Sequence, residues 1–166
     1  MNAAIVREWL HHVEADLDAA WTCARGPRAR PDRAAYLLQQ AAEKLVKAVL
    51  VSLEIDPPRA HDIGEIIAEL RPDAPFRERL AALSDLTPYA TAFRYPTPQE
   101  PPPLPSLEWI DQRIADVERS EGRFRALAGN PGGGAMSLLQ AIFVDPFVMI
   151  PELPPGRDRG LSRGHP

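Results

Sequence analysis

The sequence predicts an all-α protein, an up-down bundle of three long helices with two or three short helices. Three observations lead to this prediction. Apolar residues recur every three or four positions in three long segments, no pair of segments has the features of a β-hairpin, and proline and glycine cluster between the periodic segments. The chain has 166 residues, enough for one domain with a sizeable core, and its 19 prolines are about twice the usual share.

The first long helix is expected at residues 3 to 24, and residues 26–31, which contain glycine and proline, end it. Its apolar residues form one stripe: Val6, Leu10, Val13, Leu17, Ala20, Trp21 and Ala24. The second long helix is expected from Arg33 to Leu53, with Asp32 as its N-cap. Because it is apolar nearly all round, it is predicted to lie in the middle of the bundle.

The polar residues of this second helix collect on one strip, formed by Gln40, Glu43, Lys44 and Lys47. Glu43 and Lys47 have the i, i+4 spacing that favours an ion pair. Two interpretations stay open. In the first, the strip is the solvated edge of a buried helix, with an exposed ion pair that contributes about 0.3–0.5 kcal/mol. In the second, the two lysines and Arg94 gather positive charge for a phosphate, and Gln40 contacts a base or ribose.

Short helices are expected after the second long helix. Asp62-x-x-Glu65 is a variant of the capping box and begins the first of them. Pro75 suits the first turn of the second. Thr87-Pro88 is typical of a cap and first turn, and predicts a third.

Residues 96–105 contain six prolines and are expected to form a stiff, extended connection. Ser106 is then expected to cap the last long helix, which stops at Gly129. Residues 1–128 are therefore predicted to form one helical domain. Residues 129–166 combine a Gly-rich linker, an apolar stretch and a Pro-rich end, and are expected to be a partly disordered tail.

Composition argues against several classes of protein. The formal net charge is −4, so a polyanion binder held by bulk charge is not expected. Cys23 is the only cysteine, and one chain can form neither a disulfide framework nor a thiolate zinc cluster. No signal peptide or membrane span is found, and a cytoplasmic location is expected. No Gly-rich phosphate loop is present, and His12 with Asp16 makes too weak a metal site, so no cofactor or metal is expected.

One combination of motifs is distinctive. Gln40-x-x-Glu43-Lys44-x-x-Lys47-Ala48-x-Leu50 is followed by a proline-containing turn, by His61-Asp62-Ile63, and later by Arg94-Tyr95-Pro96. With this combination the chain resembles, over roughly residues 3–127, the HEPN family of small prokaryotic helical domains. The resemblance implies an up-down bundle that commonly dimerises. It also implies a nucleotide- or nucleic-acid-binding module paired with a minimal nucleotidyltransferase, often as a toxin and antitoxin, or a metal-independent ribonuclease.

These motifs supply the candidate site residues. The candidates for ligand binding are Gln40, Glu43, Lys44, Lys47, His61, Asp62, Arg94 and Tyr95. His61 is either a structural histidine satisfied by a carbonyl, or a donor beside the amide end of a short helix, where Asp62 already fills part of any anion site. His61 and Arg94 are also the catalytic candidates. The ribonuclease branch of the family carries Arg, then four to six residues, then His, at the start of a late helix, and this sequence lacks that pair there.

The leading hypothesis is a nucleotide- or RNA-binding module that acts with a separate nucleotidyltransferase, in a toxin-antitoxin pair. A metal-independent ribonuclease toxin and an oligomerising scaffold without ligand are the alternatives. A homodimer is expected, because the second helix and residues 135–150 offer more apolar surface than one small bundle needs. Trp9, Trp21 and Trp109 are expected in the core or a dimer contact, because nothing in the sequence clusters them on a basic face.

Overall fold

The computed structural model describes residues 3–74, 76–93 and 102–128. Within these ranges the chain is all helical, which confirms the predicted fold class. The elements are α1 (Ala3–Arg25), α2 (Pro31–Ser52), α3 (Ile63–Ala68), α4 (Arg77–Ala81), the 3₁₀ helix η1 (Ser84–Ala90) and α5 (Leu107–Ala128). None of the described helices is both long and apolar enough to cross a membrane. The predicted tail, residues 129–166, lies outside the described residues.

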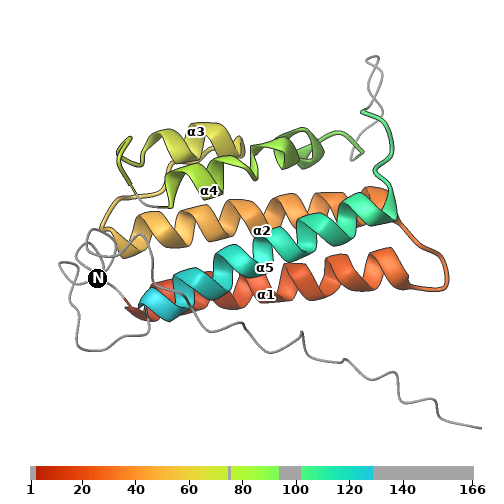
Figure 1. Ribbon diagram of the computed structural model, residues 1–166, viewed down its shortest axis with the longest axis horizontal. Coiled ribbons are helices and arrows are strands. Elements are labelled where there is room, and N and C mark those ends of the chain that lie inside the picture. The colour runs from red at the N-terminus through yellow and green to blue at the C-terminus, as the bar shows by residue number, and fades with distance from the viewer. Residues whose placement is uncertain (1–2, 75, 94–101, 129–166) are drawn as a thin grey trace, which may run out of the picture.

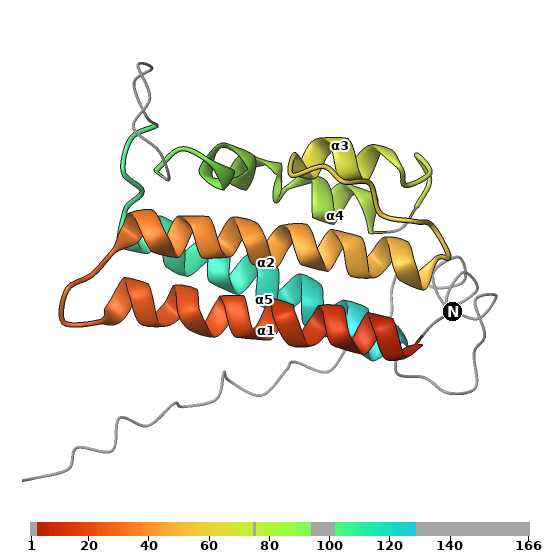
Figure 2. The same ribbon diagram turned by 180° about the vertical axis from the view of Figure 1, so that it is seen from behind.

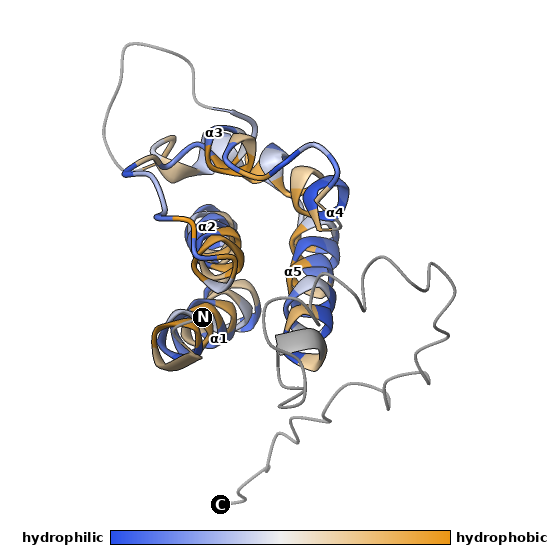
Figure 3. Cartoon of the chain, turned by 90° about the vertical axis from the view of Figure 1, so that its left-hand side faces the viewer, coloured by the Kyte–Doolittle hydropathy of each residue, from blue (hydrophilic) through white to orange (hydrophobic). Residues whose placement is uncertain are grey.

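The elements form an up-down arrangement (Figure 1). The long helices α1, α2 and α5 lie side by side, and α2 and α5 run in the direction opposite to α1 (Figure 2). The short elements α3, α4 and η1 make a return pass between α2 and α5 in the chain. Viewed along the helices, α2 lies between α1 and the short elements, with α5 beside it (Figure 3).

Helix α2 is the centre of the core, as its composition predicts. Of its 22 residues, 14 are buried, whereas α1 buries six of its 23 on a single stripe. The remaining large apolar residues of α2, Leu37 and Val51 among them, are partly buried against the core. This helix therefore has no exposed apolar face left for a second copy, and the expectation that it supplies surplus dimer surface is wrong. The other part of that expectation, residues 135–150, lies outside the described residues.

Two predicted helix starts are confirmed. In each, a side chain accepts a hydrogen bond from an amide at the end of the helix that no helical carbonyl can reach. Asp62 Oδ1 accepts a hydrogen bond from the Glu65 amide at 3.1 Å and caps α3. Ser106 Oγ accepts from the Trp109 amide at 3.1 Å and caps α5. Sequence spacing is informative here since the partners are three residues apart.

The predicted start of α2 is wrong by two residues. Its N-cap is Arg30, which makes no side-chain cap, and Pro31 occupies the first turn. A proline suits that position because it has no amide hydrogen to satisfy and its φ is already helical. Asp32 therefore lies inside the first turn, where its carboxylate accepts two hydrogen bonds from the Arg30 guanidinium at 3.0 and 2.8 Å.

The predicted third short helix is also placed wrongly. Pro88 lies inside η1 and does not begin a helix. The Thr87 hydroxyl accepts instead from the Ile63 amide at 3.1 Å, so it caps the start of α3, an element 24 residues earlier. A long-range partner of this kind has no local sequence signal. Pro75, the other predicted start, lies outside the described residues, and α4 begins at Arg77.

Candidate functional site

A buried polar network, here the Glu43 network, joins α2 to the α2–α3 connection (residues 53–62). Glu43 is its centre, because it accepts from three side chains. One carboxylate oxygen accepts from Lys47 Nζ at 2.8 Å, and the other accepts from Gln39 Nε2 at 3.1 Å. The Nδ1 atom of His61 lies 3.2 and 3.3 Å from the two oxygens. Because an ionised carboxylate can only accept, the proton between them belongs to Nδ1.

The network is covered by the α2–α3 connection. Gln39 Nε2 also donates to the His61 carbonyl, and Lys47 Nζ donates to the Ala60 carbonyl, both at 3.1 Å. Glu43 is 5% exposed and Lys47 8% exposed. The interpretation of this pair as an exposed ion pair on a solvated edge is therefore wrong, because the connection folds back over that part of the strip.

Glu43 is held in its charged form. Burial alone would raise the pKa of Glu43, but the hydrogen bonds from Lys47 and Gln39, the positive charge of Lys47 and the hydrogen bond from His61 outweigh it and hold that pKa below its usual value. A buried charge is tolerated where a partner and hydrogen bonds replace water. At neutral pH the network therefore contains a carboxylate and an ammonium group.

His61 is anchored on one side and open on the other. Its side chain is 76% exposed, although Nδ1 bonds to a nearly buried carboxylate. The partner is thus a carboxylate and not the carbonyl considered from the sequence. Because Nδ1 faces Glu43, the second ring nitrogen is directed away from the carboxylate, where it can accept a proton or a hydrogen bond and, once protonated, can donate to an anion.

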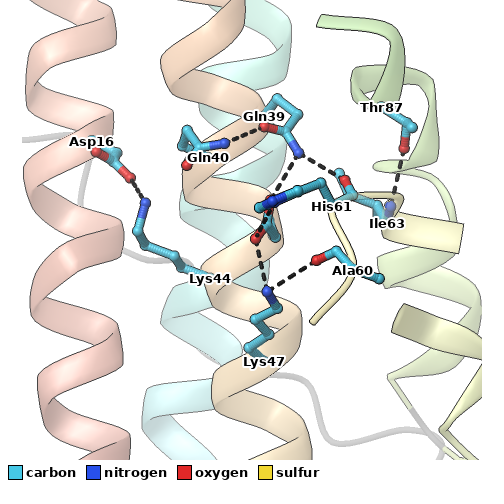
Figure 4. A network of polar contacts seen from close by, with 10 residues as sticks. Asp16, Gln39, Gln40, Lys44, Lys47, Ala60, His61, Ile63 and Thr87 are labelled. Carbon is cyan, nitrogen blue, oxygen red and sulfur yellow. Dashed lines mark hydrogen bonds and ion pairs between the residues drawn. The ribbon is translucent and has the colours of Figure 1, made fainter. Parts of the chain in front are cut away.

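The two lysines of the strip have separate partners. Lys44 Nζ reaches across to α1 and bonds to Asp16 Oδ2 at 2.6 Å, while Lys47 points toward the α2–α3 connection (Figure 4). Each lysine is neutralised by a carboxylate, so the structure does not have the two free positive charges expected on this strip. Lys44 is 23% exposed, and two of its three N–H donors are not used by Asp16.

The remaining candidates have different surroundings. Gln40 is half-buried, and its amide nitrogen donates to Gln39 Oε1 at 2.6 Å. Asp62 is committed to capping α3. Arg94 and Tyr95 lie outside the described residues. Gln40, Glu43, Lys44 and Lys47 thus lie on adjacent turns of α2, and His61 is brought against Glu43, with only some of them accessible.

Sequence reasoning missed two members of this site. Gln39 is fully buried and holds both Glu43 and the His61 carbonyl. Its signal was an amide one turn before Glu43 on an otherwise apolar face. Asp16 was considered only as a metal ligand with His12, and its pairing with Lys44 depends on how α1 packs on α2. Among the described residues there is no cluster of three or more side chains suited to a metal ion.

A cavity of about 400 Å³ lies between α1 and α2, beside Lys44. We refer to it as the α1–α2 cavity. Of the residues that the structure describes, Ile5, Glu8, Trp9, His12 and Lys44 line it. Four of these come from successive turns of α1 and one from α2, so the cavity depends on the packing of the two helices. Trp9 is partly buried and packs against the core.

Comparison with protein families identifies a family. The family model described as HEPN domain matches residues 6–120, which include the Glu43 network and all of the elements from α2 to η1. A search of curated proteins and a search of solved structures each returned no match.

Proposed function

The chain belongs to the HEPN domain family, and from this premise we propose that it is a nucleotide- or RNA-binding helical module whose contact surface centres on His61. Membership of the family is consistent with a nucleotide- or RNA-related function. We call Gln40, Lys44 and His61 the His61 surface, since they lie on one side of α2 and retain accessible donors or acceptors. The observation that carries the proposal is the exposed imidazole of His61, held in place by the nearly buried Glu43.

The Glu43 network suits a binding residue. An imidazole fixed through Nδ1 loses little conformational freedom when its other nitrogen contacts a ligand, which favours affinity. Lys47 uses two donors inside the network, so its role in the proposal is to keep Glu43 charged and in place. Lys44 keeps two donors for a phosphate oxygen, and Gln40 lies one turn away on the same helix. Arg94 and Tyr95 remain proposed ligand contacts on the strength of the family resemblance.

Titration of labelled single-stranded RNA at two salt concentrations tests the proposal. We expect saturable binding at low salt that weakens as salt rises, because phosphate contacts release counterions. His61→Ala and Lys44→Ala should each weaken binding roughly tenfold, the scale of a lost hydrogen bond to a charged group. Arg119→Ala is the matched control, since Arg119 also forms an ion pair at the surface, with Asp116, but lies on α5. If no saturable binding is observed, or if all three variants lose affinity equally, the proposal is contradicted.

We further propose that the module forms a homodimer and acts with a separate nucleotidyltransferase, in a toxin-antitoxin pair. These parts rest on membership of the family. Light scattering of the purified chain, alone and mixed with a minimal nucleotidyltransferase, measures the mass of the chain and of any complex. A monomeric mass would contradict the homodimer, and an unchanged mass on mixing would contradict the nucleotidyltransferase partner.

One observation favours a second function, a metal-independent ribonuclease. A histidine whose Nδ1 donates to a carboxylate is oriented for proton transfer at its other nitrogen, as a general base requires. His61 would take the proton of a ribose 2′-hydroxyl, whose oxygen attacks the adjacent phosphorus while the 5′-oxygen leaves with a proton from solvent. Arg94 would contact the phosphate.

Cleavage in the presence of a chelator distinguishes the two functions. A ribonuclease would cut single-stranded RNA, and His61→Ala would abolish cutting while His11→Ala, which changes an exposed histidine of α1, would not. Stable RNA with saturable binding supports the binding module instead.

A further inference from the structure

We propose that the α1–α2 cavity binds a nucleobase and prefers guanine. The biological use of such a site rests on the proposed function, because the cavity shares Lys44 with the His61 surface. The site itself is defined by its own residues and can be tested without RNA. In this proposal Trp9 contacts a ligand, whereas the sequence predicted that it would lie in the core or a dimer contact.

The size of the cavity fits a small planar ligand. Its volume of about 400 Å³ lies within the range of about 300–1,000 Å³ that is usual for small-molecule sites. On α1 it is lined by Ile5, Glu8, Trp9 and His12, which are adjacent or three or four residues apart, and Lys44 contributes from α2. The lining residues that the structure describes all lie on the regular helices α1 and α2, so the packing of these helices sets the shape of the cavity.

The apolar part of the lining favours a flat ring. Trp9 packs against the core, which fixes its indole ring, while part of the side chain stays accessible at the cavity. Ile5 is 42% exposed, one of only three large hydrophobic residues exposed in the described part of the chain. An indole beside an exposed aliphatic side chain in a concave surface matches a nucleobase, whose faces stack on aromatic side chains in single-stranded nucleic-acid sites.

The polar part of the lining distinguishes the bases. Glu8 is exposed and has no hydrogen-bond or ion-pair partner within residues 3–74, 76–93 and 102–128. Lys44 supplies donors from the α2 side of the cavity. Guanine offers N1–H and N2–H side by side, which one carboxylate can accept together, with O6 next to them as an acceptor for an ammonium or imidazole. Adenine, cytosine and uracil do not present two adjacent ring-edge donors of this kind.

The position of Lys44 connects the cavity with the His61 surface. Lys44 lies one turn from Gln40 on α2, and its ammonium bonds to Asp16 with two donors left over. A nucleotide whose base occupies the cavity therefore has Lys44, a member of the His61 surface, beside it. His12 also lines the cavity and adds a donor from α1 to those that Lys44 supplies from α2.

Titration with nucleosides, which carry no phosphate, tests the base site directly. Guanosine and adenosine are added to the full chain and tryptophan fluorescence is recorded. We expect guanosine to bind roughly tenfold more tightly than adenosine, the discrimination typical of a paired hydrogen bond to one base. Glu8→Gln should remove most of this preference, because an amide presents only one acceptor atom. Glu14→Gln is the matched control, since Glu14 is also on α1 but bonds to Arg125 of α5.

Trp9→Leu should lose binding of both nucleosides, with Glu8→Gln as the decisive variant if Trp9→Leu does not fold. Equal affinity for the two nucleosides, no binding of either, or an unchanged preference in Glu8→Gln would overturn the base site. If those results appear while RNA binding still depends on His61 and Lys44, the proposed function stands without the base site. Glu8-dependent guanosine binding in a chain that does not bind RNA would instead support the base site and remove the proposed RNA-binding function.

Discussion

Lys44 and Lys47 lie three residues apart on α2, and each is paired with a carboxylate, but their surroundings differ. The side chain of Lys47 is 10% exposed beside Glu43 and below the α2–α3 connection, whereas the side chain of Lys44 is 23% exposed and reaches across to Asp16 of α1. A lysine is a strong point charge in both places. What covers it decides whether that charge is part of the core or available to a ligand. The comparison shows that this strip divides into a structural half and an accessible half.

The largest difference between the two lysines is expected in stability. Lys47→Ala leaves the Glu43 carboxylate buried without its main partner, and such a loss typically destabilises by about 3–5 kcal/mol. Lys44→Ala breaks a pair nearer to the surface and should cost only about 0–1 kcal/mol. Urea denaturation of both variants measures the difference. Equal losses would show that the two halves of the strip are not distinct.

A double substitution sharpens the same comparison. Glu43→Leu combined with Lys47→Met removes both buried charges, and well-packed apolar replacements of a buried pair are often neutral in stability. We therefore expect the double variant to recover most of the free energy of unfolding that Lys47→Ala loses. Recovery should not extend to RNA binding, because His61 then lacks its carboxylate partner. A double variant that binds RNA as well as the natural chain would contradict the role given to Glu43.

The fold was predictable from the sequence where the signals are local. The stripe of α1, the all-round apolar pattern of α2 and the caps at Asp62 and Ser106 all depend on residues within a few positions of each other. The accessible and buried halves of the strip were not predictable. Their difference depends on the α2–α3 connection, which folds over Lys47, and on the packing of α1, which brings Asp16 to Lys44.

The candidate site follows the same rule. The motif spacing on α2 located Gln40, Glu43, Lys44 and Lys47, and the proline-containing turn located His61. It did not reveal that His61 bonds to Glu43, since the two are 18 residues apart and meet only when the connection reverses direction. The α1–α2 cavity needed the relative position of two helices and has no sequence motif.

Two buried glutamates should respond to pH in opposite directions. The pKa of Glu43 is lowered, so the stability it contributes is present above its unfolded value near 4.5 and is lost as pH falls through the lower folded value. Burial raises the pKa of Glu121, against the hydrogen bonds from Arg125, so protonation of Glu121 favours the folded state as pH falls. Between pH 7 and pH 3, urea denaturation of Glu121→Gln should therefore show a steeper acid loss than the natural chain. A shallower loss would show that Glu121 does not oppose the acid effect of Glu43.

The smallest effect is expected at two aspartates near helix starts. Asp62 caps α3 through the Glu65 amide, and Asp62→Ala should destabilise by about 1 kcal/mol, as is typical for an N-cap. Asp32 lies inside the first turn of α2 and bonds to the Arg30 side chain, so Asp32→Ala should lose only a few tenths of a kcal/mol from the helix dipole and an exposed ion pair. Thermal denaturation followed by circular dichroism compares them. If Asp32→Ala were the more destabilising, Asp32 would be acting as the cap that the sequence suggested. His61 directly precedes Asp62 in the chain. Loss of the α3 cap in Asp62→Ala should therefore also disturb the position of His61.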